Sequence, residues 1–174
     1  QKDQVVVYLD SGDVSTMERH WASVSGFTTN PSLAKAAGVT HYKDFAESAL
    51  RAAQGKPISF EVFADDLTEM ERQAKIISSW GENVYVKIPC ALTNGRSTGL
   101  LVSKLGKHGI KVNVTAIFSF QQIAELARFI DRELITTDDA TICPPEHAET
   151  LATWQRAMRR AASMAARIAN LLDL

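Results

Sequence analysis

Short runs of β-branched residues alternate with helical patterns through the first two thirds of the chain, and this alternation constrains the fold most. A strand followed by a helix forms a βα unit, and repeated βα units build a parallel sheet covered by helices. The expected strands are residues 5–10, 26–30, 58–63, 84–88 and 110–117. The expected helices begin near residue 14 and then cover residues 42–54, 66–80, 95–105 and 120–130.

After residue 130 the alternation fades. Residues 134–137 are a short candidate for a sixth strand, and acidic and proline residues follow them. Residues 148–174 have apolar side chains three or four positions apart, which is typical of one long amphipathic helix. A closed barrel of eight βα units normally takes at least about 200 residues. With 174 residues, the chain is short for such a barrel.

Composition limits the size of the fold and the kind of partner. A chain of 174 residues that is 45% hydrophobic can bury one sizeable core, so we expect one domain, with βα units in residues 1–130. The formal net charge is −1, from 19 basic and 20 acidic side chains, which gives no global attraction to nucleic acid or to an anionic membrane. The expected partner is a small molecule or another protein.

Three further absences in the sequence favour a soluble cytoplasmic protein. Cys90 and Cys143 are too few and too far apart for a disulfide framework, which suits a reducing compartment. No apolar run approaches the roughly 18 residues that a membrane span requires. The N-terminal residues also lack the charged and then apolar order of a signal peptide.

Lys87 is the residue that points most directly to chemistry. It interrupts the apolar run Val84-Tyr85-Val86-Lys87-Ile88-Pro89. Apolar surroundings favour a neutral amine over an ammonium group, and a neutral amine can attack a carbonyl to form a Schiff base. The alternative is an ordinary lysine that pairs with a carboxylate, or one whose side chain extends from the strand end into solvent.

Polar side chains recur toward the ends of all the predicted strands. Asp10 closes the first strand, Asn30 closes the second, and Glu61 lies within the third. Residues two apart on a strand share a face, so Asn113 and Thr115 point the same way on the fifth strand. The C-terminal ends of barrel strands carry the active site, because the loops there surround an open mouth.

The spacing along the chain supports one shared site. Glu61 and Lys87 are 26 positions apart, and Lys87 and Thr115 are 28 apart, each close to one βα unit. We therefore expect these side chains to converge. The alternative is a set of buried polar groups that satisfy one another, which suits Asn113 and Thr115. It suits Asp10, Glu61 and Lys87 less well, because burying an ion pair costs desolvation and gains little over apolar packing.

Five motifs in order resemble the transaldolases and the smaller fructose-6-phosphate aldolases over about residues 5–122. They are residues 8–11, 26–33, 58–62, 84–89 and 112–119. The resemblance implies an α/β fold of the TIM-barrel type, which is shortened or incomplete in this chain. It also implies a class I aldolase mechanism, with no metal and no cofactor, of the kind used in the pentose phosphate pathway.

The resemblance also implies a role for each motif residue. Lys87 looks like the Schiff-base lysine, and Asp10 resembles the acid and base that moves the proton of the ketose hydroxyl. Glu61 and Thr115 resemble the pair that holds the catalytic water. Asn30 and Asn113, with Thr29 beside the first, resemble the side chains that bind substrate hydroxyls.

The C-terminal part departs from the family pattern. In the family, a sixth strand supplies a serine and an arginine that bind the substrate phosphate, and no such motif follows Gln122. We therefore leave the phosphate-binding residues unassigned. An incomplete parallel sheet would expose strand edges and apolar faces, so we expect a homo-oligomer. Cys143 and His147 are too few for a structural zinc site, and we expect no metal.

Two functions from different classes are consistent with these patterns. The first is an enzyme that transfers or releases a dihydroxyacetone unit of a sugar phosphate through an imine at Lys87. The second is a catalytically impaired relative with a structural or partner-binding role, in which the long final helix serves assembly. The loss of pattern after Gln122 also raises the possibility that the chain is an excerpt of a longer one.

Overall fold

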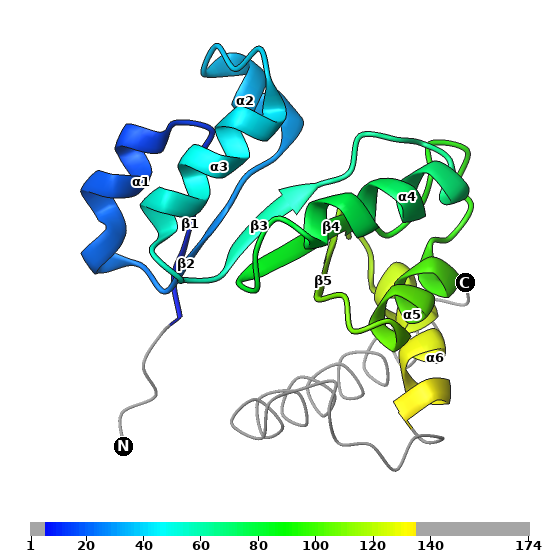
Figure 1. The fold of residues 1–174 in the computed structure, drawn as a ribbon. Coiled ribbons are helices and arrows are strands. Elements are labelled where there is room, and N and C mark those ends of the chain that lie inside the picture. Colours follow the sequence, from blue (N-terminus) through cyan, green and yellow to red (C-terminus); the bar gives the residue numbers. More distant parts are fainter. Residues whose placement is uncertain (1–5, 135–174) are drawn as a thin grey trace, which may run out of the picture. The chain divides into compact units, whose positions relative to one another are not determined.

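The computed structural model describes residues 6–134, with side chains described to residue 129. Strands and helices alternate along this part of the chain (Figure 1). The strands are β1 (Tyr8–Asp10), β2 (Gly26–Thr28), β3 (Ile58–Glu61), β4 (Val84–Pro89) and β5 (Val112–Thr115). The helices are α1 (Val14–His20), the 3₁₀ helix η1 (Trp21–Ser23), α2 (Pro31–Ala36), α3 (Tyr42–Ala53), α4 (Leu67–Ser78), α5 (Gly99–Lys107) and α6 (Phe120–Leu134).

The strands form one five-stranded sheet in chain order, β1-β2-β3-β4-β5. The pairs β1/β2, β2/β3 and β3/β4 are parallel. A parallel sheet in chain order, with helices between the strands, is the arrangement of a TIM barrel. The predicted α/β fold of a shortened barrel type is therefore confirmed for the described residues. The long helix expected at 148–174 and residues 135–137 of the candidate sixth strand lie outside them.

The chain divides into two compact units. The first comprises Gln1–Ile88 with Ile110–Asn113, and the second comprises Pro89–Gly109 with Val114–Leu174. The expectation of one domain stays a prediction. No helix within residues 6–134 is both long and apolar enough to cross a membrane.

The core of the first unit lies between its sheet and its helices. Alternate residues of β3 and β4 point to the helices and are at most 3% exposed, namely Ile58, Phe60, Val84, Val86 and Ile88. Small residues line α3, including Ala46, Ala49 and Ala53, which lets this helix lie close to α1 and to β3. Because strand side chains alternate between faces, the residues between these apolar positions face away from the helices.

Helix α2 was not expected from the sequence. Asn30 precedes it, and the side chain of Asn30 accepts a hydrogen bond from the backbone N–H of Leu33 at 2.9 Å. Pro31 occupies the first helical turn, where a missing N–H costs nothing because that group has no partner within the helix. The proline therefore begins a helix, whereas the sequence pattern predicts only a strand stop there, and β2 already ends at Thr28.

In the second unit, helices α5 and α6 pack together. Gly99 opens α5, and a Cβ atom at that position would collide with the ring of Phe129 on α6. The loop between β4 and α5 is a tight hairpin in which Ala91 pairs with Ser97. Thr98 closes this loop, with its hydroxyl donating to the carbonyl oxygen of Pro89 at 2.5 Å.

Candidate active site

Lys87 lies on β4 with only 8% of its surface exposed. Its Nζ atom donates to the hydroxyl oxygen of Thr28 and to the backbone carbonyl of Thr29, both at 3.2 Å. Thr28 ends β2, and β3 lies between β2 and β4 in the sheet. Neighbouring strands are about 4.8 Å apart, so the lysine side chain crosses the face of β3 to reach these oxygens. Lys87 is therefore a nearly buried amine that contacts oxygen acceptors.

Glu61 lies beside Lys87 in the sheet. The register between β3 and β4 pairs Glu61 directly with Lys87, and paired residues of neighbouring strands share a face. Burial raises the pKa of the Glu61 carboxyl above its ordinary value, and the nearby positive charge of Lys87 offsets part of this increase. The carboxylate of Asp10 raises the same pKa further. Glu61 therefore keeps its proton to a higher pH than an ordinary glutamate.

Asp10 joins this group from the first strand. It ends β1 and pairs with Thr28 in the parallel register. Its side chain is exposed, and its charge reaches Glu61. The first unit thus places Asp10 and Lys87 each within electrostatic range of Glu61. A shared catalytic site of these three residues stays a prediction.

Asn113 on β5 bonds to a strand that is not its neighbour. Its side-chain Nδ2 donates to the hydroxyl oxygen of Ser59 on β3 at 3.1 Å. Ser59 is 4% exposed, whereas Asn113 is half-buried. Ser59 lies two positions before Glu61, so the bond crosses β4 on the face that carries Lys87.

The arrangement combines the groups that imine chemistry needs. A nearly buried amine lies beside one carboxyl group with a raised pKa and near a second, exposed carboxylate. Amide and hydroxyl groups of Asn113, Ser59 and Thr28 share the same face of the sheet. A primary amine forms a covalent intermediate with a carbonyl, and positioned carboxyl groups move the protons that the steps require.

A sequence profile described as Transaldolase/Fructose-6-phosphate aldolase matches residues 7–163. The chain belongs to the transaldolase/fructose-6-phosphate aldolase family. The match extends past residue 122, where the motifs recognised in the sequence end.

Individual relatives named as probable transaldolases each match about two thirds of the chain. The chain is 34% identical over 119 residues to a probable transaldolase of Dehalococcoides mccartyi, covering 67% of this chain and 53% of the relative. It is 38% identical over 118 residues to a probable transaldolase of Streptococcus agalactiae, covering 66% of this chain and 52% of the relative. A probable transaldolase of Methanococcus maripaludis is 38% identical over 117 residues, with the same shares. The chain spans about half the length of these relatives.

Three further residues that the family resemblance singled out have distinct environments. The amide oxygen of Asn30 caps α2, which leaves its amide nitrogen without a partner among residues 6–134. The Thr29 side chain is fully buried, and it is the Thr29 backbone carbonyl that contacts Lys87. Thr115 ends β5 in the second unit, where its carbonyl accepts from the Cys90 N–H at 2.9 Å. A role for Thr115 beside Glu61 stays a prediction.

The sequence analysis of this transaldolase-family chain did not identify Thr28 and Ser59. Thr28 lies two positions before Asn30, and Ser59 lies two positions before Glu61. The alternation of strand side chains would have placed both on the face of the candidate site. That signal was present in the sequence, but which partner each hydroxyl contacts depends on how the sheet curves.

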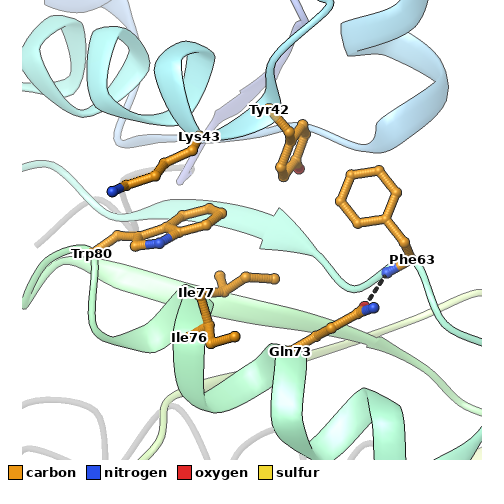
Figure 2. A pocket seen from close by; sticks show the side chains of 7 residues that line it. All are labelled: Tyr42, Lys43, Phe63, Gln73, Ile76, Ile77 and Trp80. Atoms are coloured by element: carbon orange, nitrogen blue, oxygen red, sulfur yellow. Dashed lines mark hydrogen bonds between the residues drawn. The ribbon is translucent and has the colours of Figure 1, made fainter.

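A surface pocket of about 230 Å³ lies elsewhere in the first unit (Figure 2). It opens between α3 and α4 on the helix side of β3, and its lining is mostly aromatic and aliphatic: Tyr42, Lys43, Phe63, Gln73, Ile76, Ile77 and Trp80. The rings of Tyr42 and Trp80 contact Phe60, which faces away from Glu61 on the same strand. The pocket is thus separated from Lys87 by the sheet.

Proposed function

We propose that the protein is a class I aldolase of the transaldolase type, which transfers or releases a dihydroxyacetone unit of a sugar phosphate through an imine on Lys87. The observation that carries this proposal is the placement of the nearly buried Lys87 amine beside Glu61, whose carboxyl group is also within electrostatic range of Asp10. Family membership supports the same reaction class.

The proposed reaction begins when the amine of Lys87 attacks the ketone carbon. The carbonyl oxygen takes up protons and leaves as water, which gives a protonated imine. A base removes the proton of the substrate hydroxyl, the adjacent C–C bond breaks, and its electrons move toward the imine nitrogen. The aldehyde product leaves. The remaining enamine attacks an aldehyde acceptor in a transferase, or it is protonated and hydrolysed in a lyase.

We assign the proton transfers to the two carboxyl groups. Asp10 takes the hydroxyl proton during C–C cleavage, and its exposed side chain leaves it accessible to substrate. Glu61 exchanges protons with the water that imine formation releases and imine hydrolysis consumes. The raised pKa of Glu61 suits this role, because a group that donates and accepts protons works best with a pKa near the operating pH.

We assign substrate binding to the side-chain amides of Asn30 and Asn113, with Thr29 as the third residue of this group. The cap on α2 fixes the Asn30 amide, so its nitrogen is oriented before substrate arrives. Fixed donors and acceptors of this kind reduce the entropy cost of binding a flexible polyol. We infer further that the reaction takes place in the cytoplasm, on sugar phosphates of the pentose phosphate type.

A homo-oligomer is part of the same proposal. Among the described strands β1 lies at an edge of the sheet; Val6 and Val7 just before it and Tyr8 within it are 65%, 47% and 48% exposed. Exposed apolar strands at a sheet edge favour association. Light scattering of the purified protein tests this part, and a monomer at all concentrations would contradict it.

Chemical trapping tests the reaction itself. The protein is incubated with fructose 6-phosphate and sodium borohydride, which reduces an imine to a stable secondary amine, and peptides are then analysed by mass spectrometry. We expect the adduct on Lys87, and we expect none in Lys87→Met. Lys111→Met serves as the matched control. Lys111 lies directly before β5, and its Nζ atom donates to the backbone carbonyl of Glu82 rather than to Thr28 or Thr29. An unmodified Lys87 in the wild-type protein would reject the proposal and favour a non-catalytic role.

A further inference from the structure

The hydrogen bond between Asn113 and Ser59 restricts the orientation of an amide that we assign to substrate binding. An asparagine side chain offers two donors on Nδ2 and an acceptor on Oδ1. Here Nδ2 donates to Ser59 Oγ at 3.1 Å, and Oδ1 makes no hydrogen bond within the described residues. The half-buried Asn113 therefore retains an open acceptor on its amide oxygen.

Ser59 is well placed to fix this orientation. It is 4% exposed, and it is held between two strands by the register that pairs it with Thr28 on one side and Tyr85 on the other. The Ser59 carbonyl also accepts from the Thr29 N–H at 3.1 Å. Because the backbone of Ser59 is held on both sides, its Oγ atom gives the Asn113 amide a fixed anchor on β3.

The hydrogen bond between Asn113 and Ser59 lies on the same face of the sheet as the contacts of Lys87. Ser59 and Glu61 are two positions apart on β3, and Glu61 pairs with Lys87. Asn113 reaches over β4 to Ser59, as Lys87 reaches over β3 to Thr28. An amide held in this way lies over the strand that carries the reactive amine.

We propose that Ser59 is a positioning residue that turns the Asn113 amide so that its oxygen accepts a hydrogen bond from a substrate hydroxyl. The inference rests on the proposed function, because it assigns a polyol substrate to this face. It adds a specificity rule, in which a hydroxyl donor is preferred at this position over a group that can only accept. Without Ser59 the amide can rotate and present its nitrogen instead.

Binding of an unreactive polyol tests this inference separately from the chemistry. Sorbitol 6-phosphate has the hydroxyls and the phosphate of the substrate but no carbonyl, so it cannot form an imine. Its dissociation constant is measured by calorimetry for wild type, Ser59→Ala, Asn113→Ala and the double variant. We expect Ser59→Ala to weaken binding by about 3-fold to 10-fold, which is the range for one net hydrogen bond.

The double variant shows whether Ser59 acts through Asn113. We expect Ser59→Ala to have no effect when Asn113 is already alanine, and independent effects that multiply would overturn the inference. Ser59→Thr keeps the hydroxyl and is expected to bind nearly as wild type. Ser78→Ala removes a hydroxyl that donates to the Lys75 carbonyl on α4, and it should leave binding unchanged.

Two further outcomes separate this inference from the proposed function. If Ser59→Ala does not fold, as judged by circular dichroism, Ser59→Cys provides the test, because a thiol is of similar size and a weak acceptor. Ser59→Cys should then bind sorbitol 6-phosphate about 3-fold to 10-fold more weakly than wild type. If wild type does not bind sorbitol 6-phosphate, the inference is overturned. A borohydride adduct on Lys87 in the same protein would still support the proposed function.

Discussion

Lys87 Nζ on β4 lies 3.2 Å from the hydroxyl oxygen of Thr28 on β2, two strands away in the sheet. Strands two apart are separated by roughly 9 to 10 Å, and the long lysine side chain crosses most of this distance over the face of β3. The contact therefore ties the reactive amine to a strand that is not its neighbour in the sheet.

The Thr28 hydroxyl is expected to position the Lys87 amine for attack. Thr28→Val removes the hydroxyl while keeping the shape of the side chain, and it should slow borohydride trapping by about 10-fold, equivalent to one hydrogen bond. Thr28→Ser retains the hydroxyl and should react close to the wild-type rate. Thr68→Val, at an exposed position on α4, is the control. Equal trapping rates in Thr28→Val and wild type would show that the hydroxyl has no such role.

Thr29→Val is expected to stabilise the fold. The Thr29 hydroxyl is fully buried and has no hydrogen-bond partner in the described part of the chain. Valine fills the same volume without an unpaired polar atom, so the free energy of unfolding should rise by about 1 to 2 kcal/mol. Urea unfolding measures this change. Weaker sugar-phosphate binding in this variant would instead support the substrate-binding role assigned to the Thr29 side chain from the sequence.

The raised pKa of Glu61 predicts a pH dependence of both stability and trapping. The folded protein favours protonated Glu61, so its contribution to stability is present below the ordinary pKa of 4.5 and is lost as pH rises through the folded pKa. Glu61→Gln should flatten this part of the stability profile. Glu47→Gln, at an exposed position on α3, should leave it intact. A stability profile that is identical in wild type and Glu61→Gln would contradict the burial effect.

The ionisation of Glu61 should also affect the pH dependence of turnover. We expect ionised Glu61 to activate the water that hydrolyses the imine. Turnover should then fall at acid pH as Glu61 takes up its proton, with a midpoint above pH 4.5. Glu61→Gln should lower turnover and remove this fall. Steady-state rates from pH 4 to pH 8, about the range over which a perturbed carboxyl titrates, provide the measurement. If turnover of Glu61→Gln still falls at acid pH as in wild type, the ionisation of another group causes that fall.

Gln54→Gly is expected to stabilise the first unit. Gln54 caps the C-terminal end of α3 with φ +50°, in the left-handed region. A side chain there costs about 1 kcal/mol relative to glycine, so the free energy of unfolding should rise by up to about 1 kcal/mol. Arg51→Gly, within the same helix and exposed, should lower it by about 1 kcal/mol instead. Thermal unfolding of both variants gives the comparison.

The sequence predicted the elements of the sheet well because their periodicity is local. Residues 84–88 were expected as a strand, and β4 is Val84–Pro89. Other strands are shorter than the sequence predicts. The predicted strand at residues 110–117, for example, corresponds to β5 at Val112–Thr115. Ala116 explains that limit, because its φ of +57° interrupts the extended backbone directly after Thr115. An alanine in this conformation has no signature in the sequence.

The candidate site was only partly predictable for a related reason. Glu61 and Lys87 could be paired from spacing and alternation, since both depend on regular strands. The contacts of Thr28 with Lys87 and of Ser59 with Asn113 cross an intervening strand, and they depend on the order and register of three strands, which no short segment encodes. The family profile extends to residue 163, past the last recognised motif, because a profile combines weak signals that separate motifs do not carry.

One of the two oxygens that receive the Lys87 amine belongs to the main chain, at Thr29. Replacing the side chain at position 29 leaves this acceptor in the molecule, and an alignment of relatives would not reveal it at all. Mutational scanning will therefore underestimate how strongly this position governs the lysine. Replacing the amide with an ester would not remove the oxygen either, but it would weaken it as an acceptor, which makes backbone chemistry the appropriate way to probe it.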